Sequence, residues 1–293
     1  MRNFRCAPMK DGIRVGVVGI GARGIAAVKR LMLVPGVTIA AVAGWLLQGA
    51  AGVAPHNPYG TTSHLTRTGY AAREGLCAKF SGAGGRWMRM DFDWRALERR
   101  PGNWDFSRYD DILSAAESNG VQVVGILTAP PEWCRPVWEH LDGWRGFVRN
   151  VAVRYRGRIP VYEIWNEEDA EGFWGYKPDA TNYTALLRAS YETLKAVDPS
   201  IRVALGSLTG SGGLPFGERL YAAGAAPWFD IMNVHPYPTY GRPSRPTPEG
   251  WLDVWLAKLK GIMARYGDAG KEIWITEIGW PAPHEVRFSA PGV

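Results

Sequence analysis

The sequence predicts an α/β protein built as a (β/α)8 TIM barrel, and three observations support that fold class. From about residue 52 onward, short apolar runs alternate with longer amphipathic stretches, a pattern typical of parallel strands separated by helices. Seven such units follow one another at intervals of about 35 residues, as in a TIM barrel. Polar side chains gather where the apolar runs end, which is where such barrels carry their chemistry.

The expected strands are short and apolar. They cover residues 52–56, 86–92, 121–127, 160–165, 201–206, 229–235 and 272–277. The clearest helices are expected over 105–120, 180–199 and 251–267, because each combines helical features with a Gly or Pro where it ends.

The C-terminal end of the expected barrel lacks one unit. Only 16 residues follow Glu277, and they contain neither an apolar run for an eighth strand nor a closing helix. Either the chain is a fragment, or an N-terminal strand such as "IRVGVVG" (13–19) fills the gap. We expect the first, with a barrel domain over 51–293 that is incomplete at its C-terminus.

Residues 1–50 form an N-terminal extension with two interpretations. In the first, 13–43 form strand, glycine turn, helix and strand, and Gly19, Gly21 and Gly24 match G-x-G-x-x-G. This segment resembles the start of nucleotide-binding oxidoreductases of the glucose–fructose oxidoreductase type. Those proteins place an acid at the end of the second strand to hold the ribose, and this chain has a glycine there. One βαβ unit cannot enclose a dinucleotide, so no cofactor is expected.

The second interpretation is a secretion signal. Two basic residues precede a stretch over 31–66 that contains no Lys, Arg, Asp or Glu, and its first part ends in small residues. We favour this interpretation, which predicts a secreted or periplasmic protein; if 1–50 are not a signal, the protein is expected to be cytoplasmic. A membrane anchor over 31–54 is a further alternative, which Pro35 and several glycines disfavour.

Composition excludes some function classes. The formal charge is +6, but basic and acidic residues are interspersed and no Lys/Arg-rich block appears, so a nucleic-acid partner is not expected. Cys6, Cys77 and Cys134 are too far apart for paired metal spacing, and no metal is expected. The sequence leaves open whether Cys77 and Cys134 form a disulfide. The 14 Trp residues suggest carbohydrate binding, and the alternative is that they pack in the core.

A set of polar and aromatic side chains follows the expected strands. The candidates are His56, Arg89, Trp94, Trp133, Asn166, Glu167, His235, Tyr237, Glu277 and Trp280. A purely structural barrel has no need for an Arg, an amide, two Glu, a His and a Tyr around one rim. Two carboxylates on opposed strands are the arrangement that retaining glycoside hydrolysis requires, about 5–5.5 Å apart.

Three motifs carry a resemblance to a known group of enzymes. "IWNE" (164–167), "VHPY" (234–237) and "WITEIGW" (274–280) resemble glycoside hydrolase clan A, barrel enzymes with a catalytic Glu on strands four and seven. The similarity extends over about 52–281 and is closest to family 39, with family 5 next. Clan members usually carry an aromatic residue at the end of strand eight, which this chain lacks. An unclosed barrel would expose its first and seventh strands as edges.

The resemblance assigns roles to residues of this chain. It implies that Glu167 is the acid/base and Glu277 the nucleophile. It implies that Asn166 hydrogen-bonds the sugar 2-hydroxyl, and that Arg89 and Tyr237 keep the nucleophile ionised and aligned.

The remaining candidates are less specific. His235 matches a histidine near the same site, with a packed strand-end histidine as the alternative. Trp280, Trp133 and Trp94 are candidates for sugar subsites, with packing as the alternative for each, and His56 is a further candidate for substrate binding.

Three more acids belong to the same stretch. Glu168 and Asp169 are expected to face solvent or to cap the following helix. The direction in which Glu163 faces is left open.

The prediction is thus a retaining O-glycoside hydrolase that acts on a β-linked oligo- or polysaccharide. Two alternatives stay open: a carbohydrate-binding barrel without hydrolysis, and an NAD-dependent oxidoreductase that rests on the three N-terminal glycines alone.

Overall fold

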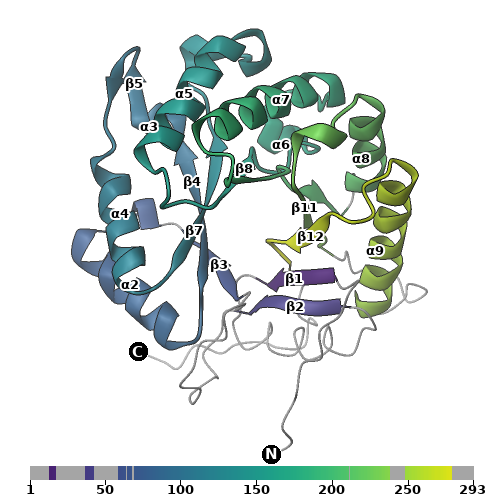
Figure 1. Cartoon of the computed structure of the whole chain (residues 1–293), viewed down its shortest axis with the longest axis horizontal. Helices are drawn as coiled ribbons and strands as arrows, with labels where there is room; N and C mark the ends of the chain where they lie inside the picture. Colours follow the sequence, from purple (N-terminus) through teal and green to yellow (C-terminus); the bar gives the residue numbers. More distant parts are fainter. Residues whose placement is uncertain are drawn as a thin grey trace, which may run out of the picture.

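A computed structural model describes residues 13–17, 37–42, 59–63, 65–67, 69–210, 212–237 and 248–278 of the chain. In these residues a parallel β-sheet curls around a central axis, and helices cover its outer side (Figure 1). This is the α/β barrel architecture that the sequence predicts.

The main sheet follows the chain order of a barrel. Its strands are β3 (Gly60–Thr62), β4 (Trp87–Asp93), β7 (Gln122–Thr128), β8 (Val161–Ile164), β9 (Arg202–Ala204), β11 (Ile231–His235) and β12 (Glu272–Ile275), each parallel to the next. The two-residue strand β10 (Leu208–Thr209) pairs with β11 as well. Six of the seven expected strands therefore lie where the sequence places them. The first, over 52–56, lies outside the described residues, and β3 is the described strand that pairs with β4 at this edge.

The long helices connect successive strands. They are α2 (Tyr70–Gly82), α4 (Ser107–Ser118), α5 (Leu141–Arg154), α7 (Ala180–Val197), α8 (Gly213–Ala222) and α9 (Pro248–Arg265). The three expected helices are confirmed as α4, α7 and α9. Helix α4 ends before Gly120, whose φ of 66° a side chain would disfavour. Asp179 caps α7 by accepting a hydrogen bond from the Asn182 amide.

Shorter elements lie in the loops. They are α3 (Trp94–Leu97), α6 (Glu171–Trp174), the 3₁₀ helices Leu65–Arg67, Glu132–Cys134, Val137–Glu139 and Ala226–Trp228, and the antiparallel pair β5 (Glu98–Arg100) and β6 (Asn103–Trp104). No helix in the described part of the chain has the length and apolarity that a membrane span needs.

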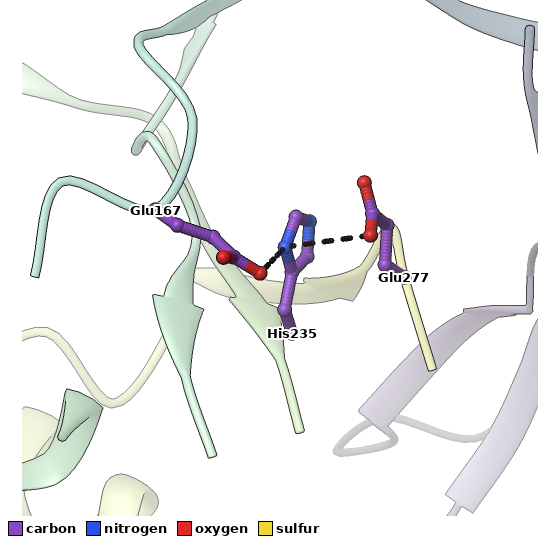
Figure 2. A group of neighbouring side chains, drawn as sticks. All are labelled: Glu167, His235 and Glu277. Carbon is purple, nitrogen blue, oxygen red and sulfur yellow. Dashed lines mark hydrogen bonds and ion pairs between the residues drawn. The ribbon is translucent and has the colours of Figure 1, made fainter. Parts of the chain in front are cut away.

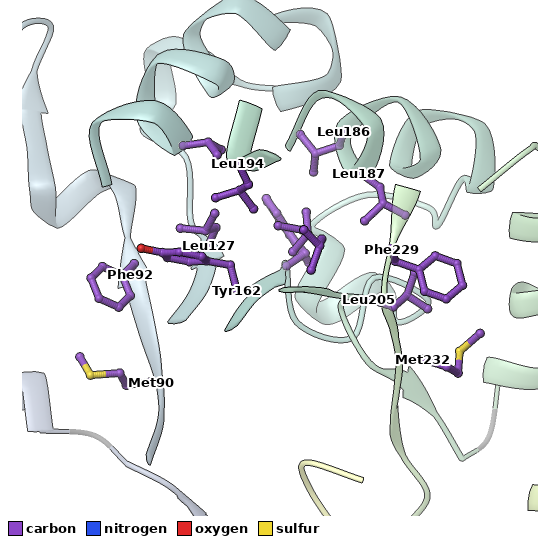
Figure 3. Close-up of a cluster of buried hydrophobic side chains, with 14 of the residues drawn as sticks. Met90, Phe92, Leu127, Tyr162, Leu186, Leu187, Leu194, Leu205, Phe229 and Met232 are labelled. Atoms are coloured by element: carbon purple, nitrogen blue, oxygen red, sulfur yellow. The ribbon is translucent and has the colours of Figure 1, made fainter. Parts of the chain in front are cut away.

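Side chains of the strands face two different regions. Phe92, Leu127 and Tyr162 belong to the large cluster between the sheet and the helices, which also contains Leu186 and Leu187 of α7 (Figure 3). A second layer fills the barrel interior, and it consists of Val124, Val161, Ala204 and Ile231 with Trp87 and Trp274. The barrel interior is therefore filled by side chains, as in other α/β barrels.

This layer settles the orientation of Glu163. Alternate residues of a strand face the same side, so Glu163 lies two positions beyond Val161 on the inner face. All four residues of β8 are buried, as expected for a strand covered on both sides. Glu163 is therefore a charged residue inside the barrel.

The N-terminal segment contributes two parallel strands, β1 (Ile13–Val17) and β2 (Val37–Val42). This agrees with the strands expected in 13–43, whereas Gly19, Gly21 and Gly24 lie outside the described residues. Strand β1 contacts β12 and β3, and Figure 1 shows it beside β12 at the open side of the sheet. It is not hydrogen-bonded into the main sheet, and no described strand of that sheet follows β12 along the chain.

Candidate active site

The C-terminal ends of the strands bring the central candidates together. Glu167 follows β8, His235 ends β11 and Glu277 follows β12, and the three side chains converge (Figure 2). His235 Nδ1 lies 2.8 Å from Glu167 Oε1 and 3.9 Å from Glu277 Oε2. One oxygen of each carboxyl group lies within 4.8 Å of the other. The sequence predicted this convergence from the strand ends alone.

Arg89 contacts three side chains of the site at once. From inside the barrel, its Nε and Nη2 donate to Glu163 at 2.7 and 2.6 Å, as a two-point ion pair. Its Nη1 donates to Glu277 Oε1 at 2.7 Å, and Nη2 donates to Asn166 Oδ1 at 2.7 Å. Arg89 is 4% exposed and Glu163 is fully buried, so the pair is shielded from solvent and its geometry is fixed.

The buried charges shift the pKa values of this pair. Burial alone would lower the pKa of Arg89, but the charges of Glu163 and Glu277 outweigh burial and raise it above its ordinary value. Burial raises the pKa of Glu163, and Arg89 opposes that rise. Ser207 donates a further hydrogen bond to Glu163 at 3.2 Å. Arg89 is therefore a permanent positive charge at this position.

Glu277 has donors on both oxygens. Arg89 donates to Oε1 at 2.7 Å and the Tyr237 hydroxyl donates to Oε2 at 2.8 Å. These two donors fix the orientation of the Glu277 carboxyl group. The pKa of Tyr237 is raised, by burial first and then by Glu277, so the phenol stays protonated and keeps donating. The roles predicted for Arg89 and Tyr237 agree with these contacts.

Glu167 has the opposite environment. Its pKa is raised to about 7, first by burial and then by the negative charges of Glu277 and Asp169. Burial and Arg89 lower the pKa of His235 well below its ordinary value, so the imidazole 2.8 Å from Glu167 is neutral. A carboxyl group with these neighbours keeps its proton near neutral pH.

The loops after β8 and β9 have an unusual backbone. Trp165, Glu167 and Ser207 have positive φ angles of 74°, 48° and 83°, which L-residues adopt at a cost of about 1–3 kcal/mol each. The Glu167 amide donates to the Gly206 carbonyl at 2.7 Å. A Cβ at Gly206 would lie 2.3 Å from the carbonyl oxygen of Ile164, so only glycine fits there. The strained loop is thus locked onto the end of β9.

Glu168 and Asp169 were expected to face solvent or to cap the following helix, and their contacts differ from that expectation. Glu168 is fully buried, and neither carboxyl oxygen has a hydrogen-bond partner among the described residues. Burial raises its pKa well above the ordinary value, and Asp169 adds to the rise, so it is protonated. Asp169 accepts hydrogen bonds from the backbone amide and hydroxyl of Thr209. The prediction was wrong for Glu168, and Asp169 ties two rim loops together without capping a helix.

The aromatic candidates have different outcomes. Trp94 is 1% exposed, donates to Glu98 at 2.6 Å and stacks on Phe147, so its assignment to a sugar subsite was wrong and packing explains it. Trp133 is 42% exposed beside Trp94, which leaves it free to contact a ligand. His56 and Trp280 lie outside the described residues.

Three side chains offer ligand atoms that a metal ion requires. Glu167, His235 and Glu277 each place one nitrogen or oxygen within 4.8 Å of the other two. The fixed charge of Arg89, 2.7 Å from Glu277, would repel a cation, and Glu167 would have to lose its proton. The arrangement therefore suits proton transfer and carboxylate attack better than metal binding.

Four polar residues around the site were not among the predicted site residues. Glu163 and Ser207 support Arg89 from within the barrel, and Asn233 and Thr276 form a buried chain behind His235. Strand periodicity would have placed Glu163 inward once Val161 was known to face the interior. Asn233 and Thr276 gave no comparable indication, since both are uncharged and each directly follows an apolar strand residue.

No protein-family model matches the chain. Among solved structures, it is similar to a family 39 glycoside hydrolase from Bacteroides cellulosilyticus WH2, with a TM-score of 0.60 and 23% identity over 75% of this chain and 48% of the other. The chain has the fold of the barrel glycoside hydrolases. A bacterial orthologue of human α-L-iduronidase has a TM-score of 0.57 at 20% identity, over 75% of this chain and 41% of the other.

A third structure extends the comparison to a different family. A GH10 endoxylanase from a sugarcane soil metagenome has a TM-score of 0.55 at 14% identity, over 78% of this chain and 69% of the other. The chain spans about half the length of the first of these structures. These similarities concern the fold.

Proposed function

We propose that this chain is a retaining O-glycoside hydrolase in which Glu167 is the acid/base and Glu277 is the nucleophile. The observation that carries the proposal is the asymmetric carboxyl pair at the ends of β8 and β12. Its oxygens approach within 4.8 Å. Retaining enzymes hold their carboxyl groups about 5–5.5 Å apart, whereas inverting enzymes leave about 6.5–9.5 Å for a water.

In the first step, Glu277 attacks the anomeric carbon while Glu167 gives its proton to the glycosidic oxygen. Glu277 is suited to attack because Arg89 and Tyr237 hold both its oxygens. Glu167 is suited to donate because its pKa of about 7 lies near neutral pH. The bond from the anomeric carbon to the leaving oxygen breaks as the bond to Glu277 forms.

In the second step, water opens the glycosyl-enzyme. Glu167, now a carboxylate, takes a proton from the water, and the departing Glu277 becomes a carboxylate again between Arg89 and Tyr237. Asn166 is the proposed partner of the 2-hydroxyl: its Oδ1 accepts from Arg89, and its NH2 group can donate to substrate.

The substrate in this proposal is a β-linked oligo- or polysaccharide. Because one similar structure is an orthologue of an α-L-iduronidase, a substrate panel should contain α-L-glycosides as well as β-D-glycosides. An extracytoplasmic location is proposed from the apolar stretch of the N-terminal segment, and N-terminal sequencing of the secreted protein tests it.

The test is covalent trapping with 2-deoxy-2-fluoro glycosides, read out by intact mass and peptide mapping. We expect an adduct on Glu277 that is absent in Glu277→Gln. Glu132→Gln is the matched control, because Glu132 carries the same functional group on an 82% exposed side chain.

Three results would count against the proposal. An adduct on a different residue would overturn the assignment of the nucleophile. Binding of a sugar panel by folded protein, with neither adduct nor hydrolysis, would favour a carbohydrate-binding barrel. Nucleotide binding in a titration with NAD(H) would favour the oxidoreductase.

A further inference from the structure

A chain of buried hydrogen bonds continues behind the proposed acid. Glu167 Oε1 lies 2.8 Å from His235 Nδ1, and His235 Nε2 lies 3.0 Å from the Thr276 hydroxyl. The Thr276 hydroxyl in turn donates to Asn233 Oδ1 at 2.9 Å. Asn233 and His235 are fully buried and Thr276 is 9% exposed, so water does not compete for these groups.

The position of each proton follows from the donor count. A threonine hydroxyl has one hydrogen, and Thr276 gives it to Asn233. Thr276 must then accept from His235, which places the imidazole hydrogen on Nε2. In a neutral imidazole the other nitrogen is an acceptor, so Nδ1 can bond Glu167 only if the carboxyl group donates.

We propose that Asn233 and Thr276 are positioning residues that hold His235 in its Nε2–H form and thereby keep the proton of Glu167 on its carboxyl group. This deepens the proposed function, on which it rests, by naming what keeps the acid protonated. If Glu167 ionised, its oxygen would face the lone pair of Nδ1 at 2.8 Å, and two acceptors at hydrogen-bond distance repel each other.

The charged groups around Glu167, apart from Arg89, also favour its protonated form. Burial and the acids Glu277, Asp169 and Glu163 disfavour its ionised form, and Arg89 alone opposes them. Arg89 also disfavours an imidazolium at His235. The one proton between Glu167 and His235 therefore stays on the carboxyl oxygen.

The first experiment requires no substrate. The chain contains five histidines, so two-bond ¹H–¹⁵N spectra of histidine-labelled protein are simple, and a His235→Gln variant assigns the signal of His235. We expect the neutral Nε2–H tautomer at pH 6–7. The Nδ1–H tautomer, which would accompany the opposite orientation of the Asn233 amide, would overturn the proposal, as would an imidazolium.

Variants of Thr276 test the direction of these hydrogen bonds. Thr276→Val removes the acceptor of Nε2–H, so His235 is expected to change to Nδ1–H and to donate to the Glu167 carboxylate. The pKa of Glu167, followed by ¹³C labelling of the carboxyl carbon, should then fall by about one unit or more. Thr276→Ser should keep the wild-type tautomer. Thr193→Val is the matched control, because it removes a buried hydroxyl that bonds only within α7.

A second pair of variants covers the case in which Thr276→Val does not fold. Asn233→Asp keeps an acceptor for Thr276 and should preserve the Nε2–H tautomer, whereas Asn233→Leu frees the hydroxyl to donate to Nε2 and should reverse it. An unchanged tautomer and an unchanged Glu167 titration in the folded variants would overturn the proposal. Because neither readout depends on turnover, this failure is distinct from a failure to hydrolyse glycosides.

An active enzyme offers one further readout. The alkaline limb of kcat/KM should move to lower pH in Thr276→Val by the same amount as the pKa of Glu167, for substrates with poor leaving groups. Dinitrophenyl glycosides require no proton from the acid, so their rates should change little. A structural defect alone would lower both rates together and leave the pH profile in place.

Discussion

Glu277→Gln should lower the pKa of Glu167. The pKa of Glu167 is raised to about 7, first by burial and then by the negative charge of Glu277. Replacing Glu277 with an amide of the same shape removes that charge and leaves the burial of Glu167 unchanged. The ionised form of Glu167 then becomes less unfavourable, so its pKa must fall.

The geometry bounds the size of this fall. Two unit charges 4.8 Å apart interact by about 3.5 kcal/mol at an effective dielectric constant of ~20, or about 2.5 pKa units. Arg89, 2.7 Å from Glu277, cancels part of that field. Burial also accounts for the largest share of the rise from 4.5 to about 7. We therefore expect a fall of about one unit, or ~1.4 kcal/mol.

The assay is a ¹³C titration of the Glu167 carboxyl carbon in wild-type protein and in Glu277→Gln. Glu167→Gln assigns the signal and Glu132→Gln serves as the charge-removal control. A titration that is unchanged or moved to higher pH would refute the electrostatic coupling of the two carboxyl groups. The same fall is expected when Glu277 is esterified in the glycosyl-enzyme, which would convert Glu167 from acid to base.

Four further predictions follow from the described residues. Urea unfolding at pH 5 and 8 should show that Glu168→Gln becomes more stable relative to wild type as pH rises. Folding raises the pKa of Glu168, so this carboxyl group stabilises the fold below its unfolded pKa of 4.5. The wild type loses that contribution as pH rises through the folded pKa. Tyr237→Phe removes a donor to Glu277 and should lower kcat/KM by about ten- to a hundredfold. An unchanged kcat/KM would show that Arg89 is sufficient to hold the Glu277 carboxylate. Trp94→Ala should destabilise the protein by about 3–5 kcal/mol, with KM unchanged in the folded fraction; a raised KM would restore its role in sugar binding. Removing residues 1–50 takes β1 away from β12 and β3, and light scattering should then detect association through the exposed strand edges, whereas a stable monomer would contradict this.

Much of the architecture could be predicted from the sequence, because strand burial leaves a strong pattern. A parallel strand covered on both sides is largely an apolar run. Strand β7 has that form from Val123 to Leu127, and β8 and β11 are buried throughout although they contain Glu163, Asn233 and His235. Strand β3 lacks it, since Gly60–Thr62 contains no large apolar residue. Its place beside β4 comes from pairing with a neighbour far along the chain, and local sequence does not encode that contact.

The same distinction applies to the site. Glu167 and Glu277 stand where apolar runs end, and the ends of parallel strands meet at one rim of a barrel. Glu163 and Glu168, by contrast, are fully buried, although charged residues near a strand end ordinarily indicate solvent. Their burial depends on Arg89 in the first case and on a bound proton in the second. Neither compensation can be recognised until the strands are placed in space.

Two glutamates at one rim are chemically different because only one of them contacts the site's fixed positive charge. Arg89 pairs with Glu163 on its inner side and with Glu277 on its outer side, so Glu163 aims the guanidinium at the nucleophile. Glu167 has a neutral imidazole as its nearest partner, and a neutral acceptor stabilises a protonated carboxyl group. Exchanging Arg89 for Lys would keep the charge but lose the planar fork that reaches both acids. The difference between acid and nucleophile therefore arises from the donors around each carboxyl group.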